Sequence, residues 1–194
     1  MPIDAETFKR VLSRWASGIT VITCRKDGGI HGMTASSFCS VSLDPPLVLV
    51  CVHQDNKTHD CVREQGAFGI HLLTSDMREL SDRCAGFRGE EAHWLDDLPH
   101  RTEVTGAPIL NCGLAWMDCS LWQDYPGGDH TIYVGQIQAA GAGPGGPLLW
   151  FGRGYRHLTD ATAIRAGQES PVLLDDEPSQ RGEDARHEPQ HRSG

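Results

Sequence analysis

The stretch that decides the fold covers residues 32–52 and reads GMTASSFCSVSLDPPLVLVCV. Its first part, residues 32–41, predicts a strand that carries several hydroxyl groups. Asp44-Pro45-Pro46 then predicts a turn, because two successive prolines cannot both serve an internal sheet ladder. Residues 47–52 (LVLVCV) form a continuous apolar run, which predicts a strand buried on both faces.

The segment before this stretch predicts one helix and one strand. Residues 4–17 are expected to form an amphipathic helix that packs on the core, with Asp4 as N-cap and Gly18 as its stop. Its apolar positions follow helical spacing: Phe8, Val11, Leu12 and Trp15. Residues 19–25 are rich in β-branched side chains and predict a strand, and Asp27-Gly28-Gly29 predicts a hairpin turn after it.

Beyond residue 52, strands outnumber helices. The patterns predict helices at 57–65 and 75–83, the second capped by Ser75 or Asp76, and a long irregular loop at 85–111. Strands are expected at 67–73, 114–122, 130–140 and 148–151. Six or seven strands without regularly alternating helices predict a mainly β, antiparallel barrel or sandwich.

Composition limits the classes of partner. The chain has 194 residues and a formal charge of −9, which argues against binding duplex DNA, since that needs a basic face. No apolar run approaches the ~20 residues of a membrane-spanning helix, and the acidic N-terminus does not resemble a signal peptide. We therefore expect a soluble, cytoplasmic protein with no nucleic-acid or membrane partner.

Cysteine and histidine spacing predicts neither disulfides nor a metal site. Seven cysteines without a secretion signal are expected to be thiols that behave as small hydrophobic residues. No CxxC or HExxH motif occurs.

The last part of the chain differs in composition. Residues 159–194 contain no Phe, Trp or Tyr and are rich in polar and acidic residues. We expect one domain over residues 1–158 and a polar acidic tail over 159–194 that is largely disordered, from about residue 176 onward.

Four segments carry groups suited to binding. Thr34, Ser36 and Ser37 cluster hydroxyls, and Asn56-Lys57-Thr58 stands at an expected helix start, where free N–H groups attract anions. Residues 127–130 (GGDH) and 151–156 (FGRGYR) add a histidine and two arginines beside strand ends. Each segment also has a plain structural interpretation: ordinary strand residues, a capped helix start, a hairpin turn and a solvated strand end.

Together these segments resemble the short-chain NAD(P)H:flavin oxidoreductases, the reductase components of two-component flavin-dependent monooxygenases. The resemblance covers about residues 5–158, and Ser-x-Ser-x-x-Pro-Pro-Leu at 40–47 is especially characteristic of that family. It implies a homodimeric split β-barrel, Greek-key-like, that binds FMN or FAD and takes electrons from NADH or NADPH. A larger monooxygenase component would receive the reduced flavin.

The resemblance also implies roles for individual residues. The ribityl and phosphate region of the flavin would meet Thr34, Ala35, Ser36 and Ser37. Backbone groups along the isoalloxazine ring would come from Cys39, Ser40, Val41 and Ser42. Phosphate would be held by Asn56, Lys57 and Thr58. His130 would lie beside the nicotinamide, Asp129 of the same motif belongs with the cofactor-binding residues, and Tyr155 would lie near the nucleotide or the dimer contact.

The implied chemistry is hydride transfer from nicotinamide to flavin, in which the protein positions the two cofactors. Two alternatives stay open at this point. One is a flavoprotein on the same barrel that acts directly on an organic substrate, and the other is a non-enzymatic flavin-binding module.

Overall fold

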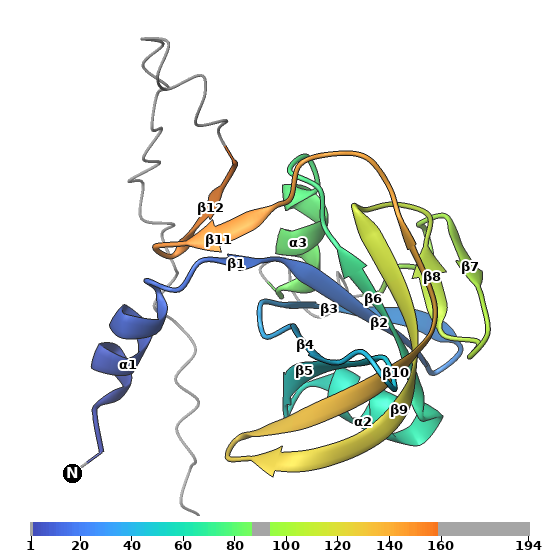
Figure 1. Cartoon of the computed structure of the whole chain (residues 1–194), viewed down its shortest axis with the longest axis horizontal. Coiled ribbons are helices and arrows are strands. Elements are labelled where there is room, and N and C mark those ends of the chain that lie inside the picture. Colours follow the sequence, from blue (N-terminus) through green and yellow to red (C-terminus); the bar gives the residue numbers. More distant parts are fainter. Residues whose placement is uncertain (1, 87–93, 159–194) are drawn as a thin grey trace, which may run out of the picture. The chain divides into compact units, whose positions relative to one another are not determined.

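The computed structural model describes residues 2–86 and 94–158, and these form a mainly β fold with short helices (Figure 1). In chain order the elements are α1 (Ala5–Leu12), β1 (Ser17–Gly18), β2 (Thr20–Lys26), β3 (Gly29–Ala35), β4 (Cys39–Ser42), β5 (Leu47–His53), α2 (Lys57–Gln65), β6 (Ala67–Leu72), α3 (Arg78–Cys84), β7 (His100–Thr102), β8 (Pro108–Leu110), β9 (Ala115–Gly127), β10 (His130–Ala142), β11 (Leu149–Phe151) and β12 (Gly154–Arg156). The predicted tail over 159–194 lies outside the described residues.

The main sheet has seven strands in the order β3-β2-β6-β9-β10-β5-β4, and its paired strands run antiparallel. A second sheet joins β1, β11 and β12, and β7 pairs with β8. The long β9–β10 hairpin curves across the lower part of the view in Figure 1 and places the start of β10 beside the end of β5. The antiparallel, mainly β class expected from the sequence is confirmed.

One hydrophobic cluster joins residues of the main sheet with α2. Phe68 and Tyr133 are fully buried there with Val62 of α2. Burying each side chain of this size stabilises the fold by about 1.5–3 kcal/mol. A second cluster, which includes Leu73, Leu110 and Leu148, packs beneath α3.

Strand β5 is less buried than its apolar run predicted. Val48, Val50 and Val52 are buried, but the alternate residues Leu47, Leu49 and Cys51 are half-buried. The expectation of burial on both faces is wrong, because only one face of β5 meets the core and the other borders a cavity described below.

The stretch after β3 is not one continuous strand. β3 ends at Ala35 and β4 begins at Cys39. Between them, the Ser37 hydroxyl accepts a hydrogen bond from the Cys51 N–H (3.0 Å) and donates one to the Cys51 carbonyl (3.1 Å). A side chain therefore takes the place of the backbone ladder, and the chain turns there. The predicted hairpin at 27–29 is present, with Asp27 and Gly28 at positive φ.

Helix α1 does not pack on the core. Asp4 caps it as predicted, accepting from the Thr7 N–H at 2.8 Å, but the helix ends at Leu12 and Gly18 belongs to β1. None of its residues is buried, and Phe8, Val11, Leu12 and Trp15 are all exposed. The helix is instead attached through its polar side, by an ion pair between Glu6 and Arg153 at 2.8 Å. The expected core-facing role is wrong.

The polar stretch after α3 is more ordered than predicted. Part of the expected loop forms β7 and β8, while residues 87–93 lie outside the described part. Asp118 of β9 is fully buried and accepts hydrogen bonds from the backbone N–H (2.8 Å) and the hydroxyl of Thr105. The N-cap position of α3 is Met77, which makes no capping hydrogen bond, so the expectation that Ser75 or Asp76 caps this helix is wrong.

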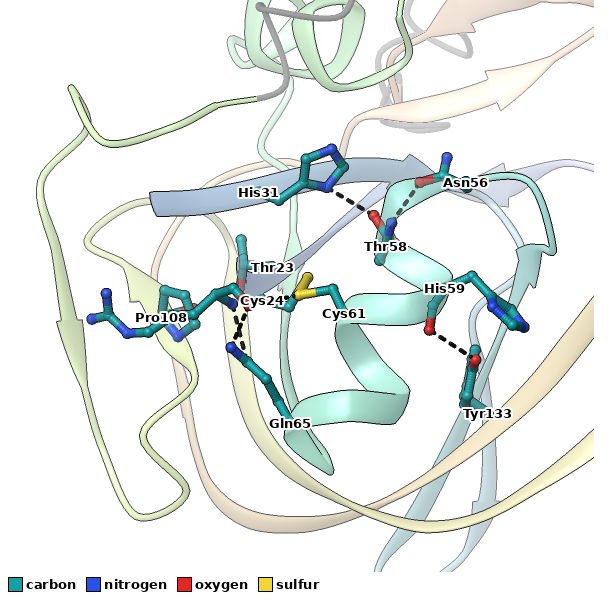
Figure 2. The surroundings of a disulfide bond; sticks show 11 residues. Thr23, Cys24, His31, Asn56, Thr58, His59, Cys61, Gln65, Pro108 and Tyr133 are labelled. Carbon is teal, nitrogen blue, oxygen red and sulfur yellow. Dashed lines mark hydrogen bonds between the residues drawn. A yellow bond between two sulfur atoms is a disulfide. The ribbon is translucent and has the colours of Figure 1, made fainter. Parts of the chain in front are cut away.

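Two cysteines form a disulfide that the sequence did not predict. Cys24 of β2 and Cys61 of α2 are bonded and fully buried (Figure 2). They are 37 residues apart and belong to no recognisable motif, so only the packing of α2 on β2 brings them together. The other five cysteines, all in the described part of the chain, are free.

Within residues 2–86 and 94–158, no helix has the length and apolar character needed to cross a membrane. The same residues contain no group of three His, Cys, Asp or Glu side chains that could hold a metal ion.

Candidate functional site

A cavity of about 330 Å³ lies where several predicted site segments meet. It is lined by Met33, Thr34, Ala35, Ser36, Ser37, Cys51, His53, Asn56, Cys84, Ala85 and His130. The end of β3, one face of β5, the residue before α2, the end of α3 and the first residue of β10 therefore form its walls. Segments that are far apart in the sequence converge because β5 pairs with β10 and α2 follows β5 directly.

The hydroxyl-rich wall is held by its own hydrogen bonds. Thr34 Oγ1 donates to the Ser81 carbonyl of α3 at 2.7 Å, and the Ser37 hydroxyl is engaged with Cys51. Ser36 is exposed in the same wall. Thr34 and Ser37 thus fix the path of the backbone, and Ser36 is the exposed hydroxyl residue of the lining.

The start of α2 forms a second wall. Asn56 Oδ1 accepts from the Thr58 N–H at 2.9 Å and so acts as the N-cap, while Thr58 Oγ1 contacts His31 Nδ1 at 3.0 Å (Figure 2). Both His31 and Thr58 are buried. The cap and this contact set the start of the helix beside the cavity, where its partial positive charge favours an anion.

Two histidines stand together at the cavity edge. His53 and His130 are direct partners in the β5–β10 register, and their ring centroids are 5.1 Å apart. Asp129 lies between them, with Oδ1 2.7 Å from His130 Nδ1 and Oδ2 3.9 Å from His53 Nε2. The hydrogen bond from His130 holds the pKa of the Asp129 carboxyl below its usual value.

The thiols in the cavity are not nucleophiles at neutral pH. Burial raises the pKa of Cys84 to about 12 and also raises the pKa of Cys51. The lining contains no carboxylate pair either. The cavity is therefore suited to binding and orienting molecules rather than to covalent or acid–base hydrolytic chemistry.

Other predicted residues do not line the cavity. Cys39, Ser40, Val41 and Ser42 form the edge strand β4, and Lys57, Thr58 and Asp129 flank lining residues. Tyr155 lies apart. Its hydroxyl bonds to Asp82 (2.5 Å) and Ser81 (3.0 Å), and burial raises its pKa to about 12.

Several lining residues were not predicted from the sequence, chiefly Cys51, His53 and Ala85. Their positions depend on the β5–β10 register and on where α3 packs. His53 could have been suspected because it directly follows an apolar run, where a strand end can pair with the start of another strand.

The lining fits a flavin. The cavity lies at the low end of the ~300–1,000 Å³ range of ligand sites. It combines an exposed hydroxyl with a helix N-terminus, which suit the phosphate and polyol oxygens of such a cofactor. Ser36, Asn56 and the backbone of residues 34–37 are the groups that would hold it.

Comparisons with known proteins agree with this fit. Residues 12–159 match the family model of the flavin reductase like domain. The chain is 36% identical to an NADH-dependent flavin reductase from Rhodococcus over 157 residues, covering 78% of this chain and 85% of the relative. It is 40% identical to the reductase component of 4-hydroxyphenylacetate 3-monooxygenase from Thermus thermophilus over 154 residues, covering 79% and 96%.

A solved structure extends the similarity to the fold. The NADH:FAD oxidoreductase of Streptomyces globisporus, determined with NAD and FAD fragments, matches with a TM-score of 0.74 at 30% identity. The match covers 83% of this chain and 98% of that one. The family model spans most of the chain, and the matches cover 85% and 96% of the two relatives, so this protein belongs to the flavin reductase like family.

Proposed function

We propose that the protein is an NADH-dependent flavin reductase that supplies reduced FMN or FAD to a partner monooxygenase. The observation that carries this proposal is the convergence of residues 34–37, Asn56 and His130 on one cavity in a chain of this family. Relatives named as NADH-dependent reductases and as reductase components support the donor and the partner.

The flavin would be held at its phosphate end by the start of α2 and along its ribityl chain by the backbone of residues 34–37. Lys57 adds positive charge next to Asn56, and Thr58 keeps the helix start in place through His31. The edge strand carrying Cys39, Ser40, Val41 and Ser42 would supply backbone groups to the ring system from the neighbouring side.

A bound flavin supplies the hydride acceptor, and the protein's part is to place the donor against it. His130 would do this for the nicotinamide. Its Nδ1 is engaged with Asp129, which leaves Nε2 as the nitrogen that can meet the carboxamide of the donor. The protonated thiols of Cys51 and Cys84 add no competing nucleophile.

We further infer that the protein works as a homodimer in which the main sheet closes into a split barrel. The apolar face of α1 supports this, because four large side chains that would normally be buried are exposed. A second copy is the occupant we assign to this face. We place the protein in the cytoplasm, where disulfides are rare, and full burial of Cys24 and Cys61 would limit the access of thiol reductants to this one.

Anaerobic titration with NADH tests the proposed activity, with FMN and FAD supplied separately and flavin absorbance recorded. The expected result is bleaching of one or both flavins by one equivalent of NADH, with many turnovers of free flavin in air. Oxidation of NADH that does not depend on free flavin would instead support a direct flavoprotein oxidoreductase. No oxidation with either flavin would overturn the proposal.

Two Asn56 variants separate flavin binding from folding. Asn56→Asp keeps an N-cap acceptor but puts a negative charge at the phosphate end, so flavin affinity should fall about tenfold or more with little change in Tm. Asn56→Ala removes the cap and should also lower stability by about 1 kcal/mol. Flavin fluorescence quenching and thermal denaturation measure the two effects, and unchanged affinity in Asn56→Asp would contradict the phosphate assignment.

A further inference from the structure

The mouth of the cavity carries a three-residue arrangement that the implied hydride transfer does not require. His53 ends β5, His130 begins β10, and Asp129 lies in the turn just before it. The side chains of His53 and His130 are 45% and 41% exposed, and both line the cavity. Half-exposed imidazole rings keep one orientation only where specific contacts hold them.

The hydrogen bonds fix the roles of the imidazole nitrogens. His53 Nδ1 accepts from the backbone N–H of Asp55 at 3.1 Å, so the proton of a neutral His53 ring is on Nε2. That nitrogen is 3.9 Å from Asp129 Oδ2, and the other carboxylate oxygen is hydrogen-bonded to His130 Nδ1. Asp129 is thus approached from both sides by a ring N–H.

The two rings also touch directly. Their planes are inclined at 79° with centroids 5.1 Å apart, an edge-to-face contact. His53 therefore restricts His130 in two ways: through the shared carboxylate and through the ring contact. A carboxylate that orients a histidine sets which nitrogen faces the ligand.

We propose that His53 is a positioning residue that holds Asp129 and His130 in the orientation that binds the nicotinamide donor. This inference rests on the proposed function, since it assigns His130 to the donor. It assigns His53 to donor affinity and not to flavin affinity, because the flavin-holding groups lie at residues 34–37 and Asn56.

The test is steady-state oxidation of NADH at saturating FMN in the full-length protein. His53→Phe keeps a ring but removes both nitrogens, and it should raise the KM for NADH about three- to fivefold, the size expected for an exposed ion contact. The kcat and the Kd for FMN should stay within about twofold of the wild type. His53→Gln restores an N–H donor and should recover most of the loss.

Two further variants separate positioning from a general effect on structure. His157→Phe makes the same substitution at an exposed histidine that does not line the cavity, and its KM should match the wild type. Adding His53→Phe to His130→Ala should cause no further increase in KM, because His53 acts through His130. An unchanged Tm in His53→Phe shows that the fold is intact.

The outcomes distinguish this inference from the proposed function. If the wild type oxidises NADH and His130→Ala raises the KM while His53→Phe does not, the role of His53 is overturned and the reductase activity stands. An equal rise in KM from His53→Phe with and without His130 would also overturn it. If the wild type oxidises no NADH with FMN or FAD, the proposed function itself fails.

Discussion

The fully buried histidine of β6 makes the stability of the core depend on pH. His71 of β6 is fully buried, and its Nε2 lies 3.1 Å from Thr23 Oγ1. The Thr23 hydroxyl donates to the Pro108 carbonyl at 2.6 Å, so the Nε2–H of His71 must donate to Thr23. Its other nitrogen, Nδ1, is buried without a hydrogen-bond partner among the described residues. Burial of the ring, with the nearby charge of Arg101, lowers the pKa of His71 from 6.5 to about 4.

This pKa predicts a loss of stability in mild acid. Between pH 6.5 and about 4, the unfolded chain binds a proton at residue 71 that the folded protein does not. Stability therefore rises with pH across this window, is fully present above it, and is lost as pH falls toward 4. We expect the free energy of unfolding to be about 2 kcal/mol lower at about pH 5 than at about pH 7.5.

Urea denaturation at the two pH values measures this difference. His71→Gln cannot titrate, and its unfolding free energy should depend less on pH by that amount, even if the variant is less stable overall. An equal pH dependence in the variant and the wild type would show that other groups are responsible.

At the scale of elements, α2 is linked to the main sheet at several points along its length. The disulfide joins its middle to β2, Thr58 meets His31 near its start, and Gln65 near its end accepts from the Arg25 N–H at 3.0 Å (Figure 2). The Tyr133 hydroxyl donates to the His59 carbonyl at 3.0 Å. The helix that borders the cavity is thus linked to β2, β3 and β10.

The disulfide should contribute substantially to stability. Closing a loop across 37 residues of sequence separation corresponds to about 4 kcal/mol in the chain-entropy model. We expect Cys61→Ala to lower the free energy of unfolding by more than Cys119→Ala, which removes a buried sulfur that is not cross-linked. Chemical denaturation of both variants without reductant checks this. Equal losses would show that the cross-link adds nothing, and mass spectrometry of the wild type before and after reduction identifies the bond directly.

The elements that could be predicted are those set by local chemistry. Asp4 caps its helix as expected, Asn56 caps α2 as the plain structural interpretation of that segment has it, and the 27–29 turn follows from residues that tolerate positive φ. Features set by distant contacts could not be predicted in this way. Cys24 meets Cys61, Asp118 meets Thr105, and His53 meets His130 only after the sheet has formed.

In the candidate site too, features set by the local sequence could be predicted and features set by distant contacts could not. The segments around residues 34–37, Asn56 and His130 were found from their motifs, and the structure brings them together. The break between β3 and β4 was missed because it depends on a hydrogen bond from Ser37 to a strand 14 residues further on. The exposure of α1 was missed because helical spacing indicates an apolar face without indicating what covers it.

For the whole molecule, the apolar face of α1 predicts self-association. The exposed side chains Phe8, Val11, Leu12 and Trp15 would be covered by the second copy. We expect light scattering coupled to gel filtration to give about twice the 21.2 kDa mass for the wild type. Trp15→Glu should shift the protein toward the monomer, because it would bury a charge in the interface.

A matched substitution controls for added charge. Val104 is 68% exposed and lies outside α1, so Val104→Glu should leave the mass unchanged. A monomeric wild type, or a dimer that Trp15→Glu does not weaken, would contradict the assignment of α1 to the dimer contact.

The disulfide and hydrogen bonds that hold α2 affect how quickly the protein can bind its cofactor. A helix bonded to three strands loses its conformational freedom when the protein folds. Little further ordering of this helix is then needed when flavin binds. Capture of flavin then requires no slow rearrangement of this wall, and its rate should rise in proportion to flavin concentration. Rapid binding and release of this kind suit a protein that passes its flavin to a partner instead of retaining it.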